Sequence, residues 1–365
     1  MDNYSQDVYK GKRILITGHT GFKGSWLSLW LKELGADVIG YALEPPTKPN
    51  LFEVLSLNEK VTHIIGDVRD EKHLHSVFEK YQPEFVFHLA AQPLVRLSYK
   101  EPKLTYETNV MGTVNVLEAV RKTDSVRSCI IVTSDKCYEN REWIYGYRET
   151  DSIGGYDPYS SSKGCAELVT AAYRSAFYNP KDYEKIHNVA LSSVRAGNVI
   201  GGGDWGEDRL IPDCIRALSQ NKAINIRNPQ ATRPWQYILE PLTGYLLLGA
   251  LMYEDGAKYS SAWNFGPNDE SIKTVAELVK RVIKYWGGGT YTIDTLNHPH
   301  EAAFLKLDAS KARALLGWKP IYNVYEAVEK TINWYKNFYN GMRKEKLYEF
   351  TAEEIGEYVN RMRDE

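Results

Sequence analysis

The first two hundred residues alternate between short apolar runs and stretches with helical periodicity. Apolar runs typical of strands buried on both faces lie at residues 13–17, 37–42, 61–65, 85–89, 129–133 and 189–193. Helical patterns separate these runs, and the first of them covers residues 25–34. This alternation predicts an α/β fold in which residues 1–194 form a doubly wound parallel sheet.

The pattern changes after residue 195. Loops containing glycine, tryptophan, arginine and proline follow, with helical patterns at 211–219 and 239–252. The strand-like run 262–265 is expected to rejoin the main sheet, so that residues near 238–266 return to the first domain. Helical patterns at 274–286, 309–316 and 324–338 predict a smaller, mostly helical and loop-rich C-terminal lobe over residues 195–345. The charged, weakly amphipathic residues 346–365 predict a marginal helix or a mobile C-terminal tail.

A glycine-rich turn links the first apolar run to the first helix. Its residues, 18–24, read Gly-His-Thr-Gly-Phe-Lys-Gly. Glycines at such a turn let the backbone approach a pyrophosphate, and the N–H groups at the helix start bind the anion. The spacing is GxxGxxG and not the more usual GxGxxG, and a glycine triplet alone fits an ordinary strand-to-helix turn about as well. The strand–turn–helix setting favours a dinucleotide site, and hence a Rossmann-like domain.

Tyr159 and Lys163 lie four residues apart on a predicted helix and so share one face. A tyrosine with its ordinary pKa of about 10 is roughly one part in a thousand phenolate at neutral pH. A nearby ammonium group favours the phenolate, which can then act as a general base toward a hydroxyl group. Such a pair also arises by chance in a chain with 26 tyrosines. The pair therefore becomes evidence for a catalytic tyrosine only in combination with the glycine-rich turn upstream.

The triplet Ser134-Asp135-Lys136 follows directly after the apolar run 129–133. Taken alone, Asp135 and Lys136 fit a solvated ion pair worth under about 1 kcal/mol. Ligands of α/β proteins bind at the carboxyl ends of the strands, however, and the triplet lies at such an end. This placement favours a role in chemistry.

Composition narrows the class of protein. With 365 residues and 43% apolar content the chain can bury a large core, and a net charge of −2 gives no long-range attraction for nucleic acid or an anionic membrane. No secretory leader is recognisable, and the longest apolar stretch, near 245–253, is too short to cross a bilayer. The cysteines lack metal-ligand spacing and the density of a disulfide scaffold; they are Cys129, Cys137, Cys165 and Cys214. We expect a cytoplasmic protein without a metal site.

Taken together, these motifs resemble the extended short-chain dehydrogenase/reductase superfamily and, within it, the nucleotide-sugar 4,6-dehydratases. The resemblance runs from residue 18 to about residue 320. Besides the features above, it rests on Asp67-Val68, His88-Leu89-Ala90-Ala91-Gln92, Thr108-Asn109 and Arg195-Ala196-Gly197-Asn198. More discriminating motifs favour the members that act on CDP-glucose; they are Gly201-Gly202-Gly203-Asp204-Trp205, Arg227-Asn228-Pro229, Ala231-Thr232-Arg233-Pro234-Trp235-Gln236 and Leu239-Glu240-Pro241-Leu242.

The resemblance implies a reaction with NAD as a cofactor that is not consumed. Tyr159, helped by Ser134 and Lys163, would oxidise carbon 4 of the sugar. Lys136 would then remove the proton from carbon 5, and Asp135 would protonate the departing 6-hydroxyl group. The product would be a 4-keto-6-deoxy sugar for the dideoxy sugars of surface polysaccharides such as lipopolysaccharide.

The resemblance also assigns binding residues and a partner. The expected cofactor residues are Gly18, Gly21, Phe22, Gly24, Asp67, Val68, Ala90 and Thr108, together with Tyr159 and Lys163. The expected substrate residues are Gln92, Arg96, Asn198, Arg209, Arg233 and His300. Members pair through two long helices, which here lie near 103–121 and 159–178, so a homodimer or homotetramer is expected.

Two departures and several alternatives stay open at this stage. The second strand ends in Tyr41-Ala42-Leu43, without the acid that often holds the adenosine ribose, although no arginine for a 2′-phosphate is seen either. The dTDP-glucose dehydratases have Asp-Glu where this chain has Asp135-Lys136. Alternative functions are a nucleotide-sugar 4-epimerase, which would not need the charged pair, a 4,6-dehydratase for dTDP- or GDP-linked hexose, a net dehydrogenase, and a noncatalytic NAD-responsive regulator.

Several large or charged side chains also allow two interpretations. Arg195 fits a surface charge or a diphosphate ligand. Trp205, Trp235 and Tyr237 fit packing better than stacking on a nucleobase.

Overall fold

The central sheet is parallel, as the alternating pattern predicts. The computed structural model describes residues 6–294 and 304–364. The strands of the sheet are β1 (Arg13–Thr17), β2 (Asp37–Ala42), β3 (Thr62–Ile65), β4 (Phe85–His88), β5 (Ser128–Val132), β6 (Ala190–Ala196) and β10 (Ala262–Phe265). They lie in the order β10-β6-β5-β4-β1-β2-β3, with every neighbouring pair parallel. The expected return of residues 262–265 to this sheet is confirmed.

Both faces of the sheet are buried, and consecutive strand residues alternate between two hydrophobic clusters. In β1, Ile14 and Ile16 belong to the larger cluster and Leu15 to the smaller one. A strand covered on both faces needs apolar residues at every position, which explains the continuous apolar runs.

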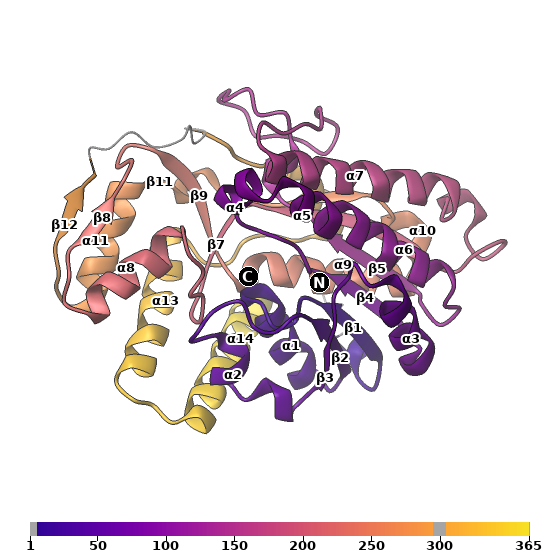
Figure 1. Ribbon diagram of the computed structural model, residues 1–365, viewed down its shortest axis with the longest axis horizontal. Coiled ribbons are helices and arrows are strands. Elements are labelled where there is room, and N and C mark those ends of the chain that lie inside the picture. Colours follow the sequence, from indigo (N-terminus) through magenta and orange to yellow (C-terminus); the bar gives the residue numbers. More distant parts are fainter. Residues whose placement is uncertain (1–5, 295–303, 365) are drawn as a thin grey trace.

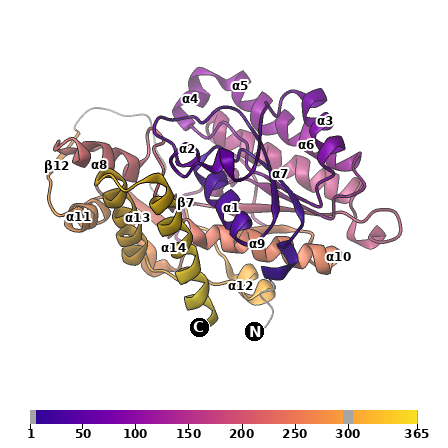
Figure 2. The same cartoon turned by 90° about the horizontal axis from the view of Figure 1, so that it is seen from below.

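Helices cover the two faces (Figures 1 and 2). The smaller cluster lies under α3 (Glu71–Tyr81), α6 (Gly112–Arg121) and α7 (Pro158–Ala176). Two short helices, α4 (Val95–Lys100) and α5 (Pro102–Tyr106), and the π-helical turn η3 (Glu107–Met111) lead into α6. The larger cluster lies under α1 (Phe22–Glu33), α9 (Leu239–Glu254) and α14 (Lys344–Asp364). Shorter helices on the edges are α2 (Leu51–Val54) and α10 (Gly256–Tyr259), with 3₁₀ turns η1 (Gln6–Tyr9), η2 (Leu57–Glu59), η4 (Asp135–Cys137), η5 (Pro180–Asp182) and η6 (Asp269–Ser271).

The smaller lobe lies beside the carboxyl ends of the strands (Figure 1). It contains one sheet in the order β11-β9-β7 and a two-stranded pair β12-β8. Their strands are β7 (Asn198–Ile200), β8 (Ile224–Ile226), β9 (Thr232–Tyr237), β11 (Ile272–Thr274) and β12 (Tyr291–Ile293), and the helices of the lobe are α8 (Leu210–Ser219), α11 (Val275–Trp286) and α13 (Val324–Tyr339). The remaining helix, α12 (Ser310–Leu316), packs on β10 and α9 of the main domain, so its expected place in the smaller lobe is wrong.

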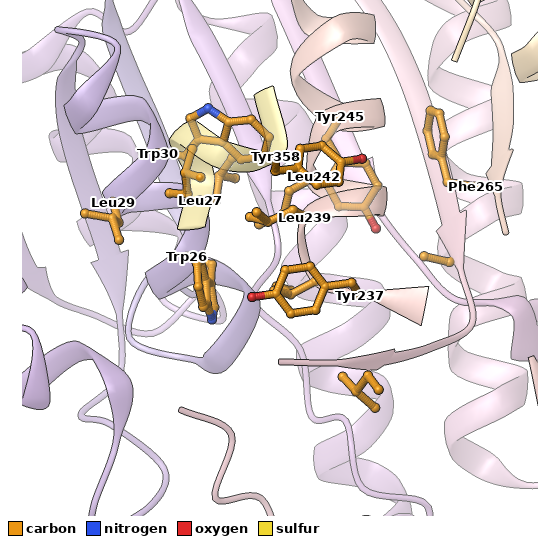
Figure 3. Packing of buried hydrophobic residues seen from close by; sticks show 14 of the residues in the cluster. Trp26, Leu27, Leu29, Trp30, Tyr237, Leu239, Leu242, Tyr245, Phe265 and Tyr358 are labelled. Carbon is orange, nitrogen blue, oxygen red and sulfur yellow. The ribbon is translucent and has the colours of Figure 1, made fainter. Parts of the chain in front are cut away.

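The C-terminal segment is a docked helix and not a separate tail. In α14, Leu347, Ile355 and Tyr358 are buried. Figure 3 shows Tyr358 beside Trp30 of α1, with the ring centroids 6.2 Å apart. The Tyr358 hydroxyl also donates a hydrogen bond of 2.6 Å to Glu240 on α9. These tertiary contacts stabilise a helix whose own sequence is only weakly amphipathic. Among the described residues, every helix is too short or too polar to span a bilayer.

Candidate active site

The glycine turn lies at the switch point of the sheet, where β1 and β4 are neighbours and their following helices lie on opposite faces. Gly18 has a φ of +76°, and a Cβ atom there would lie 2.7 Å from the Ala90 nitrogen. A Cβ atom on Gly24 would lie 2.2 Å from the Gly18 oxygen. Side chains at these positions would fill the turn.

The start of α1 is suited to an anion. Phe22 begins the helix after Gly21, which caps it without a side-chain hydrogen bond. The positive end of the helix dipole therefore faces the glycine cradle. Gly18, Gly21, Phe22 and Gly24 thus fit the pyrophosphate of a dinucleotide.

The other expected cofactor residues follow β3 and β4 at the same edge. The Asp67 carboxylate accepts hydrogen bonds from Arg69, which lower the pKa of Asp67. The Tyr41 hydroxyl, where an acid is common, donates to the Asp67 carbonyl oxygen (2.9 Å). Val68 is buried against Gly112. These contacts hold the loop after β3 close to the sheet.

Ala90 and Thr108 lie on neighbouring segments. The Ala90 N–H donates to the Thr17 hydroxyl at 3.2 Å. Thr108 lies in η3, a π-helical turn of the kind that often marks functional sites. The adjacent Asn109 accepts from the Gln92 nitrogen (2.8 Å) and donates to the Ser162 hydroxyl (2.8 Å). Asn109 therefore ties the loop after β4 to α7.

Tyr159 and Lys163 are buried side chains in the first turns of α7. The helix begins at Pro158, and the Asp157 carboxylate caps it by accepting from the Ser160 nitrogen (2.9 Å). Lys163 Nζ donates to the Val132 carbonyl oxygen at 3.3 Å. The helix start is therefore fixed immediately before Tyr159.

The pKa of Tyr159 differs from the sequence-based expectation. Burial raises it to about 12; the hydrogen bond with Ser134 and the charge of Arg209 lower it, and Asp135 raises it. Burial lowers the pKa of Lys163 to about 8, against the effect of Glu167. Within the protein, therefore, the hydrogen bond with Ser134 and the charge of Arg209 favour the phenolate.

Asp135 and Lys136 are adjacent but lie in different surroundings. The Asp135 side chain is buried and accepts from the Ser134 hydroxyl at 2.9 Å. Burial raises the pKa of Asp135, although Lys136, Ser134 and Lys23 each act to lower it. Lys136 is exposed, and its Nζ lies 6.0 Å from the centroid of the Tyr159 ring. A buried carboxyl does not fit a solvated surface pair; it fits a proton donor beside an accessible amine.

A buried ion pair connects the main sheet to α7, the helix that carries Tyr159. Arg195 on β6 donates to Glu167 on α7 at 2.7 Å, and both side chains are buried. Glu167 also accepts from the hydroxyls of Thr133 (2.5 Å) and Ser193 (2.7 Å). Arg195 is therefore neither a surface charge nor a diphosphate ligand. It holds α7 against β6, the neighbour of the strand β5 that leads to Ser134.

The candidate substrate residues divide into several groups. Arg96 on α4 pairs with Asp208 at 3.1 Å, and Arg209 pairs with Asp204 at 2.9 Å. Arg233 on β9 donates to the Thr232 carbonyl oxygen at 2.9 Å. These guanidinium groups lie on the loops and strands of the smaller lobe and on α4.

The three remaining candidate substrate residues are Asn198, Gln92 and His300. Asn198 begins β7, opposite Trp235 of β9. Gln92 does not fit a substrate role, because its amide donates to Leu94 (3.1 Å) and Thr105 (2.9 Å) and accepts from the Leu94 nitrogen (2.6 Å). Gln92 orders the loop before α4. The remaining candidate, His300, lies outside the described residues.

Two functional candidates escaped the sequence reasoning. Burial lowers the pKa of Lys23 to about 8, and Arg209 lowers it further whereas Asp135 raises it. The charges of Lys23 and Asp135 therefore act on each other, and a charged residue inside the glycine turn was the available signal. Asp204, in the Gly-Gly-Gly-Asp-Trp motif, is buried beside Arg209. The interpretation of Trp205, Trp235 and Tyr237 as packing residues is confirmed, since all three belong to the larger cluster.

The chain is similar to known proteins over nearly its whole length. The family model described as GDP-mannose 4,6 dehydratase matches residues 15–331. The CDP-glucose 4,6-dehydratase of Salmonella typhimurium is 52% identical over 356 residues, which cover 97% of this chain and 98% of that protein. A putative UDP-glucose 4-epimerase of Methanocaldococcus jannaschii is 28% identical over 330 residues, 89% of this chain and 98% of that protein. The crystal structure of dTDP-glucose 4,6-dehydratase from Bacillus anthracis in complex with NAD has a TM-score of 0.74 and 21% identity, covering 91% of this chain and 98% of that one. This last likeness confirms the doubly wound fold.

Proposed function

Because the chain belongs to the GDP-mannose 4,6-dehydratase family, we propose that it is a hydro-lyase that uses NAD to convert CDP-glucose to CDP-4-keto-6-deoxy-glucose and water. The observation that carries this proposal is the pairing of a buried acid, Asp135, with an accessible amine, Lys136, next to Tyr159. Oxidation of an alcohol alone needs no such pair, whereas elimination of water needs both an acid and a base. The high identity to a CDP-glucose 4,6-dehydratase supports the nucleotide.

The residues at the switch point would hold NAD. The turn at Gly18, Gly21 and Gly24 would take the pyrophosphate, and Asp67 and Val68 would lie toward the adenine. Tyr159 and Lys163 would face the nicotinamide ribose. When bound, NAD supplies a reversible acceptor that takes hydride from carbon 4 of the sugar and returns it to carbon 6.

Tyr159 removes the proton from the 4-hydroxyl group, and Ser134 hydrogen-bonds the same oxygen. Carbon 4 becomes a ketone as a result. Because burial raises the pKa of Tyr159, positive charge must offset that effect. Arg209 supplies part of this charge within the protein, and a nicotinium ring beside the phenol would add to it.

Lys136 and Asp135 act once the ketone has made the hydrogen on carbon 5 acidic. In its unprotonated form the amine of Lys136 would take that proton, and Asp135 gives its own to the 6-hydroxyl group, which leaves as water. The raised pKa of Asp135 keeps this carboxyl protonated to higher pH than an exposed aspartate. A double bond between carbons 5 and 6 remains; addition of hydride at carbon 6 and of a proton at carbon 5 would convert it to the 4-keto-6-deoxy product.

A nucleotide-sugar 4-epimerase is the second candidate, since relatives of that description align over most of the chain. An epimerase would return hydride to carbon 4 and would have no use for Asp135 and Lys136. A 4,6-dehydratase for dTDP- or GDP-linked hexose is a further alternative.

One experiment separates these functions. We expect loss of one water from CDP-glucose, and much slower loss from dTDP-, GDP- and UDP-glucose, as measured by mass spectrometry. Deuterium placed on carbon 4 should appear at carbon 6 of the product, with no free NADH accumulating. Deuterium retained at carbon 4 of an isomerised sugar would support an epimerase, and labelled NADH in solution would support a net dehydrogenase.

The proposal includes a homodimer or a dimer of dimers. Its support is that η3, α6 and α7 pack side by side (Figure 1). Met111 of η3 and Leu168 of α7 are exposed at 50% and 60%. A second copy of the chain that packs on these helices would bury such apolar side chains.

We expect sedimentation at micromolar concentration to show a dimer or tetramer of the 41.7 kDa chain. The Met111→Glu/Leu168→Glu variant should shift the protein toward monomer, because charges would be buried without partners. The substitution Ile186→Glu, at an exposed residue beyond the end of α7, is the control. A wild-type protein that sediments only as a monomer would reject this part of the proposal.

We also propose that the protein acts in the cytoplasm. The four cysteines are free thiols, which suits a reducing cytoplasm. The product would feed the synthesis of dideoxy sugars of surface polysaccharides such as lipopolysaccharide.

A further inference from the structure

Gly197 links the main sheet to the sheet of the smaller lobe. β6 of the main sheet ends at Ala196, and β7 of the smaller lobe begins at Asn198. The motif Arg195-Ala196-Gly197-Asn198 therefore crosses from one lobe to the other. Arg195 is accounted for by its ion pair with Glu167, and Asn198 by its pairing in β7. Neither contact explains why residue 197 is a glycine.

The Asp135 carboxyl group lies directly against Gly197. A Cβ atom on Gly197 would lie 2.9 Å from Asp135 Oδ2 and 3.6 Å from Asp135 Cγ. Pro234 Cγ of β9 would be 3.9 Å away, which is an ordinary van der Waals distance. The φ angle of Gly197 lies outside the left-handed region that favours glycine, so the backbone conformation does not demand one. The group that leaves no room for a side chain at residue 197 is therefore Asp135 itself.

The two oxygens of the Asp135 carboxyl group have different neighbours. The Ser134 hydroxyl donates to Oδ1 at 2.9 Å, whereas Oδ2 faces Gly197. The Ser134 hydroxyl also accepts from the Lys136 nitrogen at 3.3 Å, which holds it within its own turn. Asp135 is only 5% exposed and so has little room to turn away from these contacts. Such confinement suits a catalytic group, which must stay within about 0.5 Å of its productive position.

We propose that Gly197 is a positioning residue: the absence of a side chain there leaves room for the Asp135 carboxyl group to face the 6-hydroxyl group of the sugar. This inference rests on the proposed function, because it concerns the elimination step. In that step the Asp135 proton passes to the 6-oxygen, the bond from carbon 6 to that oxygen breaks, and water leaves. Lys136 takes the proton from carbon 5, and the electron pair of that bond becomes the double bond between carbons 5 and 6.

Oxidation at carbon 4 should not depend on Gly197. Tyr159 lies on α7, and the ion pair between Arg195 and Glu167 ties that helix to β6 before the chain reaches Gly197. A substitution at Gly197 is therefore expected to displace the acid of the elimination step and to spare the base of the oxidation step.

Gly197→Ala should push the Asp135 carboxyl group out of its position, because Cβ atoms essentially never come within 3.0 Å of such an atom. We expect single-turnover experiments with CDP-glucose to show reduced nicotinamide forming within about two-fold of the wild-type rate. Water loss, measured by mass spectrometry, should fall by about ten-fold, since the acid is displaced and not removed. Reduced nicotinamide should therefore accumulate before water is lost.

The control is Gly356→Ala on α14, where a Cβ atom would meet nothing within 4 Å; this variant should turn over normally. Normal water loss by Gly197→Ala would overturn the proposal, and so would equal falls in oxidation and in water loss. A raised KM with unchanged kcat would overturn it as well, because the added methyl group would then exclude the substrate and leave the acid in place.

A second measurement needs no substrate. Asp135→Ala removes the carboxyl group that faces Gly197, so the added methyl group should fit in the double variant Asp135→Ala/Gly197→Ala. We expect Gly197→Ala to lower the Tm in the wild-type background but not in the Asp135→Ala background. Equal effects on the Tm in both backgrounds would overturn the proposal. If Gly197→Ala does not fold, a folded double variant supports the proposal and an unfolded one overturns it.

The double variant also has a kinetic readout. Its rate of water loss should equal that of Asp135→Ala, because Gly197 acts through Asp135, and a further fall would overturn the proposal. If the wild-type protein dehydrates no nucleotide sugar, the proposed function fails, while the comparison of Tm values still tests the contact between Gly197 and Asp135.

Discussion

Tyr159→Phe is expected to lower kcat by a factor of about 10² to 10⁴, the usual contribution of a general base. The substitution removes the phenolic oxygen and keeps the ring, which is buried at the start of α7. Fold and NAD binding should therefore persist, as thermal unfolding and calorimetric titration with NAD can show. In the wild-type enzyme kcat should fall at low pH, because the phenolate is the active form and its protonation removes the base.

The control for this variant is three residues upstream. Tyr156 is 87% exposed, and Tyr156→Phe should leave kcat within about two-fold of wild type. Near-normal turnover by Tyr159→Phe would remove Tyr159 from the mechanism. A variant that loses NAD binding as well would instead indicate that the hydroxyl mainly holds the cofactor.

The elements of the main sheet follow from the sequence because its strands are buried on both faces. The bounds of β1, β2 and β10 match the apolar runs, since each run is flanked by polar residues or a turn. β6 extends to Ala196, beyond the predicted end at 193, because β10 pairs with its last residues from Ser193 onward. Such an extension depends on a partner strand some seventy residues away, which local periodicity does not reveal.

The burial of α14 and of Arg195 likewise depends on partner residues that lie far away in the sequence. The buried face of α14 includes Glu354 and Tyr358, whose partners Tyr237 and Glu240 lie more than a hundred residues earlier. A polar residue looks solvent-facing in a sequence until its buried partner is known. The sequence likewise allows Arg195 to be a surface charge or a diphosphate ligand, whereas Glu167 neutralises it inside the protein.

The sequence predicts where the candidate site lies but not how its side chains are oriented and buried. Strand ends and the glycine turn bring Gly18, Ser134 and Tyr159 to one edge of the sheet, as the topology of α/β folds requires. The opposite environments of Asp135 and Lys136 depend on how the turn η4 directs each side chain. Lys23 lies in the first turn of α1 and Arg209 immediately before α8, so the effect of one charge on the other depends on the packing of the two lobes, which the sequence does not show.

The variants Asp135→Asn and Lys136→Met are expected to oxidise the substrate at carbon 4 but not to eliminate water. Asparagine keeps the oxygen that accepts from Ser134 but has no acidic proton to give to the 6-hydroxyl group. Methionine keeps the length of Lys136 but cannot take the proton from carbon 5. Since both groups act after the ketone has formed, each variant should oxidise carbon 4 and then stop. Overall water loss should fall by about 10² or more, within the usual range for an acid or a base.

The stalled state has a spectroscopic signature, because the reduced-nicotinamide absorbance should grow in a single turnover and remain. Mass spectrometry should find a 4-keto sugar that has kept its 6-hydroxyl group. The control is Lys181→Met in the exposed turn η5, which should turn over normally. A folded, NAD-bound variant that neither oxidises nor dehydrates would show that the pair orients the substrate or tunes Tyr159. Full water loss in both variants would exclude Asp135 and Lys136 from the chemistry, and the burial of Asp135 would then need a purely structural explanation.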